Sequence, residues 1–211
     1  MIFEQIPVGG DRNYAYLIGD EDSKKAAVVD PAYTPEKILR RAANLGLSIE
    51  YIINTHGHFD HTNGNQTIQE ATGATIAAHP SNNPERPLND TDSLYLGGTE
   101  LHIIYTPGHT ADSICILADN KLCTGDTLFV GKVGGTDYGY SARQEYDSLH
   151  QKIMTLPDNV EVYPGHNYGL KPSSTIKEER EHNPFLLQKS FTDFVHLKKN
   201  WLQYKKEHGI P

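Results

Sequence analysis

Short apolar segments, some alternating with polar positions and some continuous, run through the chain and predict strands. Those near the N-terminus are separated by the glycine turns Gly9-Gly10 and Gly19-Asp20, and a later meander includes the turn Gly97-Gly98. The predicted strands are residues 2–8, 14–18, 26–30, 49–53, 74–79, 94–96, 100–106, 113–117, 121–125 and 160–163.

Segments with helical periodicity lie between several of these strands. The first helix has both ends marked, because Thr34 suits an N-cap, Pro35 suits the first turn and Gly46 follows the last apolar position. Further helices are expected over residues 65–72 and 143–156, and two more close the chain. The last of these carries apolar residues at helical spacing: Phe191, Phe194, Val195, Trp201 and Leu202.

The order of elements favours mixed sheets covered by helices, because the strands come in hairpin-like groups rather than in strict alternation with helices. Residues 80–90 contain three prolines and no periodicity, which predicts a loop that could act as a lid. The glycine-rich residues 130–140 fit neither phosphate-binding fingerprint. We interpret them as an active-site loop.

Composition narrows the class of protein. The chain has 211 residues and a net charge of −8, which argues against nucleic acid or an anionic membrane as partner. The N-terminal residues lack the pattern of a signal peptide, and no segment approaches the roughly 20 apolar residues of a membrane span. Cys115 and Cys123 lie inside apolar runs and are expected to be buried hydrophobes. A cytoplasmic enzyme or binding protein is expected.

Four segments share one arrangement in which a strand ends and a metal-type ligand follows in the turn. They are IINTHGHFDH, HIIYTPGHT, KLCTGDT and VEVYPGHNYG. A lone histidine is usually a surface or hydrogen-bonded residue, but this many polar groups could not be buried together without partners. The candidate ligands are His56, His58, Asp60, His61, His109, Asp126 and His166.

The candidate ligands are too many for one zinc ion, since a catalytic zinc takes about three protein ligands and keeps one position open. They suit two divalent ions that share one carboxylate. Zinc is the first expectation for both ions, with iron and manganese as alternatives. The other histidines carry no such pattern and are interpreted as ordinary surface or hydrogen-bonded residues.

The segment THGHFDH, followed in order by TPGHT, TGDT and PGH, resembles the motifs of the metallo-β-lactamase superfamily. The resemblance implies an α+β fold, an αββα sandwich of two mixed β-sheets with helices on the outer faces. It implies one domain over residues 1–211, with C-terminal helices at 173–208 packed on the core. It also implies a partition of the ligands: His56, His58 and His109 on one metal, Asp60, His61 and His166 on the other, and Asp126 bridging them.

Within that superfamily, LCTGDTLFVG and PGHNYG look most like the hydroxyacylglutathione hydrolases, the glyoxalase II family. Their resemblance implies that Tyr168, in the G-H-x-Y motif, contacts glutathione. True β-lactamases characteristically lack the bridging aspartate, so Asp126 counts against lactam hydrolysis. The tail TIKEEREHNPFL resembles small bacterial relatives of the family and persulfide dioxygenases.

A dinuclear centre of this kind predicts a thioesterase mechanism. The two ions, with Asp60, Asp126 and a hydroxide, would keep about one net positive charge in a partly dry pocket. A metal-bound hydroxide would then be available near neutral pH to attack the thioester carbonyl, and the leaving thiolate suits zinc. Asp60 and Asp126 are the expected catalytic carboxylates. The expected partner is a small-molecule thioester or a glutathione-linked substrate, with the oligomeric state left open.

Three other interpretations stay open from the sequence. His56, His109 and Asp126 alone could form a two-histidine, one-carboxylate set for a single iron, as in a persulfide dioxygenase. A lactonase is a rival within the hydrolases. A metal-binding module without catalysis is the third, and low turnover of every ester, thioester and persulfide would favour it.

Overall fold

The first of two six-stranded sheets is built from the N-terminal part of the chain. The computed structural model describes residues 1–210. The antiparallel strands β1 and β2 are followed by parallel pairing from β3 to β6, so this sheet is mixed. In sheet order the strands are β1 (Ile2–Gly9), β2 (Asn13–Gly19), β3 (Lys25–Val29), β4 (Ser48–Ile53), β5 (Thr75–Ala78) and β6 (Arg86–Pro87).

The second six-stranded sheet is also mixed, because its only parallel pair in the described chain joins β10 to β13. A separate two-stranded hairpin, β11 (Leu128–Phe129) with β12 (Lys132–Val133), follows it. In sheet order the strands are β14 (Ser174–Thr175), β13 (Glu161–Pro164), β10 (Lys121–Gly125), β9 (Ile114–Ala118), β8 (Thr99–Tyr105) and β7 (Ser93–Leu96).

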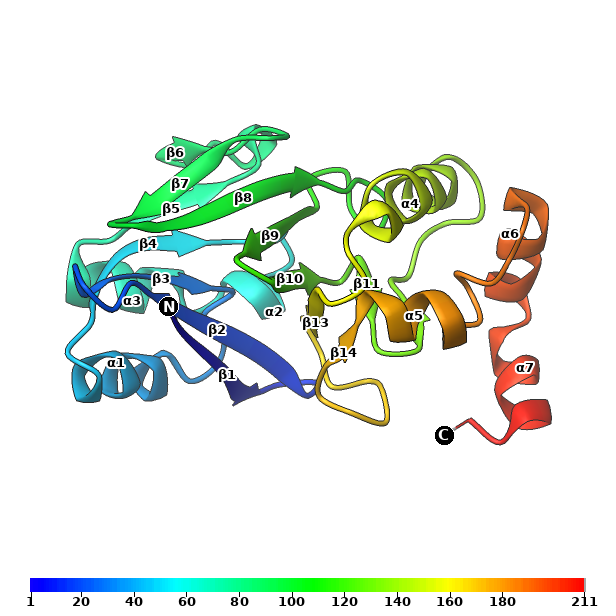
Figure 1. Ribbon diagram of the computed structural model, residues 1–211, viewed down its shortest axis with the longest axis horizontal. Coiled ribbons are helices and arrows are strands. Elements are labelled where there is room, and N and C mark those ends of the chain that lie inside the picture. The colour runs from blue at the N-terminus through cyan, green and yellow to red at the C-terminus, as the bar shows by residue number, and fades with distance from the viewer. Residues whose placement is uncertain (211) are drawn as a thin grey trace.

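Helices lie outside both sheets (Figure 1). On the first sheet they are α1 and α3, and on the second α4, α5 and α6, while α2 lies at the sheet edge. Their bounds are α1 (Pro35–Asn44), α2 (Phe59–Thr62), α3 (Asn65–Thr72), α4 (Tyr140–Gln151), α5 (Ile176–His182), α6 (Phe191–Lys199) and α7 (Trp201–His208). Two 3₁₀ turns complete the structure, η1 (Pro80–Asn82) and η2 (Ile153–Thr155).

Three apolar clusters correspond to the three interfaces of this αββα sandwich. Between the sheets, Ile18 and Val29 of the first pack in one cluster with Ile103 of the second. Alternate residues of β2 point the other way, so that Leu17 belongs to the cluster beneath α1 and α3. The third cluster joins the second sheet to α4, α5 and α6, with Phe194 among its buried side chains. Both faces of β2 are therefore buried, which explains why its sequence is an almost continuous apolar run.

Most predicted elements are present, and several differ at their ends. The structure adds short elements that were not predicted, among them η1 and β6 within the predicted loop 80–90 and β12 within the predicted loop 130–140. Thr34 occupies the N-cap position of α1, but its hydroxyl donates to the carbonyl of Val8 (3.3 Å) instead of capping. The helix predicted over 143–156 begins at Tyr140 and ends at Gln151. The apolar spacing of the sequence extends beyond Gln151 because Ile153, in η2, is buried in the same cluster as the helix.

The C-terminal region contains three helices where two stretches were predicted. The predicted last helix breaks at Asn200, whose side chain donates to the carbonyl of His196 (2.8 Å). Phe194 is buried in α6, whereas Leu202 in α7 is 74% exposed, so the apolar spacing does not mark one continuous buried face. Within residues 1–210, no helix is both long and apolar enough to cross a membrane.

Candidate metal centre

The polar turns predicted to carry chemistry meet at one edge of the sandwich. The loop after β4 and the short helix α2 supply residues 56–61, and the loops after β8, β10 and β13 supply one residue each. All seven predicted ligands are brought together here. Among the described residues, three overlapping groups place nitrogen and oxygen atoms within 4.8 Å of one another: His56, His58 and His109; His56, His61 and Asp126; Asp60, His61 and His166.

Three histidines form the first candidate ligand set. Nδ1 of His58 lies 3.0 Å from Nε2 of His56 and 3.1 Å from Nε2 of His109. His56 is buried, and the side chain of His109 is only 13% exposed. Three imidazole nitrogens facing one point suit a zinc or iron ion.

The second set contains one carboxylate and two histidines. Oδ2 of Asp60 lies 3.4 Å from Nε2 of His166 and 3.7 Å from Nε2 of His61. The two imidazole nitrogens are 3.1 Å apart. Asn13 fixes the carboxylate by donating from Nδ2 to both its Oδ2 (3.1 Å) and its backbone carbonyl (3.0 Å).

Asp126 lies between the two sets. Its Oδ2 is 3.6 Å from Nε2 of His109 and 3.5 Å from Nε2 of His166, and its Oδ1 is 3.4 Å from Nε2 of His61. Burial favours the neutral acid, but the hydrogen bond to His166 and the charge of His61 hold the pKa of Asp126 below its ordinary value. Its buried Oδ1 has no hydrogen-bond partner. An ionised oxygen in that position requires a cation.

The ring orientations follow from the hydrogen bonds on the far side of each imidazole. Carbonyl oxygens only accept, so Nδ1 of His109 donates to Gly135 (2.8 Å) and Nδ1 of His166 donates to Asp11 (2.9 Å). Nδ1 of His61 donates to the carboxylate of Asp30 (3.0 Å). In each neutral ring the Nε2 lone pair therefore points into the cluster.

Asp30 also fixes His56 through Thr55. The Thr55 hydroxyl donates its proton to Asp30 Oδ2 (2.6 Å), so it accepts from Nδ1 of His56 (3.0 Å). The backbone amide of Thr55 donates to the other oxygen of the same carboxylate (2.8 Å). Asp30 thus orients one histidine in each ligand set.

The residues present fit divalent cations. Lone pairs of His61 and His166 at 3.1 Å repel one another unless a proton or a metal ion lies between them. Without an ion a proton takes that place: burial opposes the charge, but Asp30, Asp126 and Asp60 raise the pKa of His61 to about 9. Burial, with the charge of His61, lowers the pKa of His56 well below its ordinary value. The cluster therefore places carboxylates that attract positive charge beside imidazole nitrogens that can bind a metal ion.

Sequence reasoning missed Asp30 and Asn13. Both are buried polar residues at the ends of strands in the first sheet, Asp30 after β3 and Asn13 at the start of β2. The pattern that identified the candidate ligands is a polar residue directly after an apolar strand. Asp30 fits the same pattern, because it follows the apolar run AAVV. Asp30 also has φ of +49°, a conformation that aspartate tolerates better than most residues.

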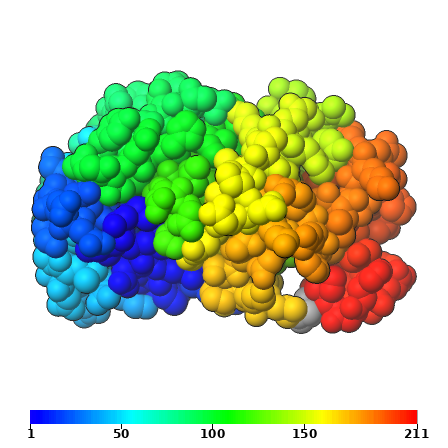
Figure 2. Space-filling view, in the orientation of Figure 1, coloured from blue at the N-terminus to red at the C-terminus, as the bar shows by residue number. Residues whose placement is uncertain are grey.

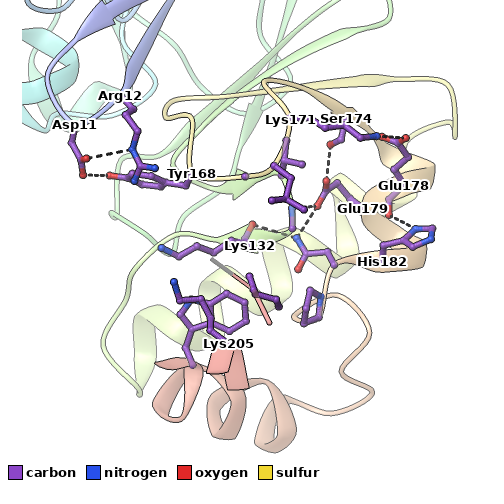
Figure 3. Close-up of a pocket in the computed structure, with 18 residues that line it drawn as sticks. Asp11, Arg12, Lys132, Tyr168, Lys171, Ser174, Glu178, Glu179, His182 and Lys205 are labelled. Carbon is purple, nitrogen blue, oxygen red and sulfur yellow. Dashed lines mark hydrogen bonds and ion pairs between the residues drawn. The ribbon is translucent and has the colours of Figure 1, made fainter. Parts of the chain in front are cut away.

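A cavity of about 800 Å³ adjoins the cluster on the side of Tyr168. The Tyr168 ring stacks on His166 with centroids 4.7 Å apart, and its hydroxyl donates to Asp11 (2.6 Å). Arg12 and Lys132 lie 4.8 and 4.9 Å from the ring centre. Figure 3 shows these two cations beside Tyr168, with Lys205 of α7 on another wall.

The cavity opens between the segment around residue 170 and α7, where Figure 2 shows a gap between the gold and red surfaces. Its floor includes the hairpin turn at Gly131, held by Glu179 of α5, which accepts from the amide of Gly131 (3.0 Å). The predicted active-site loop at 130–140 therefore contributes to both the cavity and the cluster, through Lys132 and Gly135 respectively. The lid role of residues 80–90 stays a prediction.

Comparison with known proteins gives similarities to enzymes of several kinds, among them persulfide dioxygenases and hydroxyacylglutathione hydrolases. Persulfide dioxygenase ETHE1 of Bos taurus is 34% identical over 82% of this chain and 71% of its own length. The hydroxyacylglutathione hydrolase of a Polaromonas species is 32% identical over 95% of this chain and 91% of its own length. The crystal structure of ETHE1 from Myxococcus xanthus has a TM-score of 0.90 and 36% identity, covering 95% of this chain and 91% of that one.

The model of the metallo-β-lactamase superfamily matches residues 8–166, a range that contains all seven predicted ligands. The two mixed sheets with helices outside agree with that fold. The expected fold class is therefore confirmed, as is the resemblance to hydroxyacylglutathione hydrolases. The chain belongs to the metallo-β-lactamase superfamily.

Proposed function

We propose that this chain is a metal-dependent hydrolase that cleaves thioesters, of the hydroxyacylglutathione type. The observation that carries the proposal is the pair of complete ligand sets on either side of Asp126. Each set has three ligands, the number that a catalytic site provides while leaving a position open. The hydroxyacylglutathione hydrolase of Polaromonas supports the same reaction class.

His56, His58 and His109 would hold one divalent ion, and Asp60, His61 and His166 the other, with Asp126 shared. When bound, such ions supply a hydroxide nucleophile near neutral pH and polarise the substrate carbonyl. The protein contributes orientation, since Asp30, Asn13 and two backbone carbonyls fix the ligands before any ion arrives. Zinc fits both nitrogen-rich sets, and iron fits them too.

The cavity beside Tyr168 is suited to the thiol carrier. Lys132 is half-buried there and has no ion-paired carboxylate among the described residues, while Arg12 extends over the same ring. A carrier with carboxylates, such as glutathione, would offset the charge of Lys132, since Arg12 already has Asp11 beside it. Its sulfur would then lie toward His166, on which Tyr168 stacks.

A persulfide dioxygenase with one iron is the second candidate, favoured by the similarity to the Bos taurus enzyme. It would use His56, His109 and Asp126. The position of His58 favours the hydrolase, because its Nδ1 lies about equally far from Nε2 of His56 and of His109 (3.0 and 3.1 Å). A two-histidine, one-carboxylate set leaves that nitrogen without a role.

The deciding experiment combines metal analysis with two assays on one preparation, purified without added metal. Hydrolysis of S-lactoylglutathione is followed by thiol release, and oxidation of glutathione persulfide by oxygen consumption. Two metals per chain with thioester turnover is the expected result. One iron per chain with oxygen consumption would replace the proposal by the second candidate, and turnover of the thioester by metal-free protein would remove its basis.

A further inference from the structure

The loop that orients His109 passes through a confined space. The carbonyl of Gly135 accepts from Nδ1 of His109 at 2.8 Å. At the preceding residue, Gly134, a Cβ would lie 2.1 Å from the carbonyl oxygen of Asp126 and 3.0 Å from Cβ of His109. The backbone at 134–135 is thus pressed against two predicted ligand residues, and a small shift of it moves the acceptor of His109.

A buried lysine holds this loop from behind. Nζ of Lys198, in α6, donates to the carbonyl of Gly134 (2.7 Å) and pairs with the carboxylate of Glu145 in α4. The side chain of Lys198 is 6% exposed and that of Glu145 is fully buried. The three groups come from separate segments of the chain, so their meeting depends on how the outer helices pack.

Glu145 also reaches the other side of His109. At Gly108, directly before that histidine, a Cβ would lie 2.4 Å from Cα of Glu145, so α4 packs against the backbone there. The Oε2 atom of Glu145 receives Lys198, while Oε1 has no hydrogen-bond partner. Such a pair is weak evidence for added stability, because well-packed apolar residues often replace a buried ion pair at no cost in stability.

We propose that Lys198 is a positioning residue, which acts through the carbonyl of Gly134 to hold Gly135 against Nδ1 of His109. Glu145 keeps the Lys198 ammonium at that carbonyl. This inference rests on the proposed function insofar as His109 binds a metal. The outer helices would then control the three-histidine set and leave the set of Asp60, His61 and His166 to its own partners.

The test compares Lys198→Met with Lys199→Met. Lys199 is the adjacent, exposed lysine, whose Nζ lies 5.5 Å from the ring of Tyr138, so it controls for loss of a charge on α6. A third variant, Glu145→Gln with Lys198→Met, leaves no unpaired charge in the interior and protects the test against misfolding. Zinc affinity is measured by competition with a chromophoric chelator. The ring N–H of His109 is followed in proton–nitrogen spectra of the metal-free and zinc-loaded proteins.

For Lys198→Met and the double variant, we expect the affinity of one of two zinc sites to fall by about tenfold or more, as for other residues that orient a ligand. The His109 N–H signal should shift or exchange faster in both, even without metal. Lys198→Arg should restore part of the affinity, and Lys199→Met should match wild type.

Recovery of both readouts in the double variant would overturn the proposal, because a merely structural pair would be repaired there. An unchanged His109 signal in Lys198→Met would overturn it as well. Failure of the wild-type protein to bind zinc would instead remove the proposed function, while the signal of His109 in metal-free protein still tests the positioning.

Discussion

Asp30 and His61 are joined by a buried hydrogen bond, with Nδ1 of the ring 3.0 Å from Oδ2 of the carboxylate. The same oxygen accepts from Thr55, which orients His56. One carboxylate therefore sets the ring orientation in both ligand sets. The backbone of Asp30 has a φ of +49°, which few residue types adopt readily. Asparagine is a substitution that this backbone conformation tolerates.

Asp30→Asn should weaken metal binding at both sets. The amide carries no charge and accepts with its oxygen only. Either His61 and the Thr55 hydroxyl both lose their acceptor, or the backbone amide of Thr55 loses its own. We expect affinity to fall by about 10–100-fold, measured by chelator competition. Asp20→Asn is the matched control, since Asp20 is a buried carboxylate after the far end of β2. Equal affinity in the two variants would contradict the role of Asp30.

Asp126→Asn separates the two candidate functions when it is compared with changes at His61 and His166. In a dinuclear hydrolase all three substitutions should lower kcat for S-lactoylglutathione by orders of magnitude, because each removes a ligand or the shared charge. In a mononuclear iron enzyme, Asp126→Asn abolishes oxygen consumption, while His61→Ala and His166→Ala matter much less. Near wild-type turnover of the best substrate by both histidine variants would show that the dinuclear mechanism is wrong.

Gly165→Ala should disrupt the centre without replacing any predicted ligand. A Cβ at Gly165 would lie 2.5 Å from Oδ1 of Asp126 and 2.8 Å from Cε1 of His61, so one of them must move. We expect less bound metal and a lower kcat. Gly98→Ala, in the turn between β7 and β8, is the control, because a Cβ there makes only an ordinary contact, 3.7 Å from Oδ2 of Asp20. If both variants retain wild-type metal content, the centre is more tolerant than its packing implies.

Tyr168 and Lys132 are expected to act on binding of the carrier. Tyr168→Phe removes the donor to Asp11, and Lys132→Met removes a cation beside the ring. Each should raise KM for glutathione thioesters several-fold with little change in kcat, the pattern of lost uniform binding. Steady-state kinetics on a glutathione thioester and on an uncharged thioester measure the difference. A KM that rises equally for both substrates would argue against recognition of carrier charge.

Acid should destabilise the protein partly through Asp20. Hydrogen bonds from the side chain and backbone of Ser23, with another from Thr99, lower the pKa of Asp20 from 3.8 to about 2. Because the folded pKa is depressed, this contribution is present above pH 3.8 and is lost as pH falls through 2. Urea midpoints between pH 5 and 2 should fall less steeply for Asp20→Asn than for wild type.

The candidate ligands could be identified from the sequence because each polar turn directly follows an apolar run. His56 after β4 and His166 after β13 needed no knowledge of the fold to be noticed. The helix over residues 65–72 could also be predicted from the sequence. It ends at Gly73, which has a left-handed backbone conformation (φ +72°). Periodicity and turn residues are local properties, so they survive without tertiary information.

The hydrogen-bond partners of the candidate ligands could not be predicted from the sequence. Asp30 follows an ordinary apolar strand, and only the folded chain shows that His61, 31 residues later, donates to it. The Lys198 and Glu145 pair spans 53 residues and joins two helices that the sequence does not orient. The break at Asn200 was not predicted because Trp201 and Leu202 continue the apolar helical spacing beyond it. Such contacts depend on packing between distant elements.

Each predicted ligand set takes residues from both sheets. His56 and His58 follow β4 of the first sheet, while His109 follows β8 of the second, and His61 and His166 divide in the same way. A bound ion would therefore be a cross-link across the interface between the sheets, at the edge where they could separate. At a free metal concentration of 100 times Kd it would add about 2.7 kcal/mol to the stability of the folded chain. Metal supply would then set the lifetime of the native state, so a chain starved of metal would be lost to proteolysis as well as inactive.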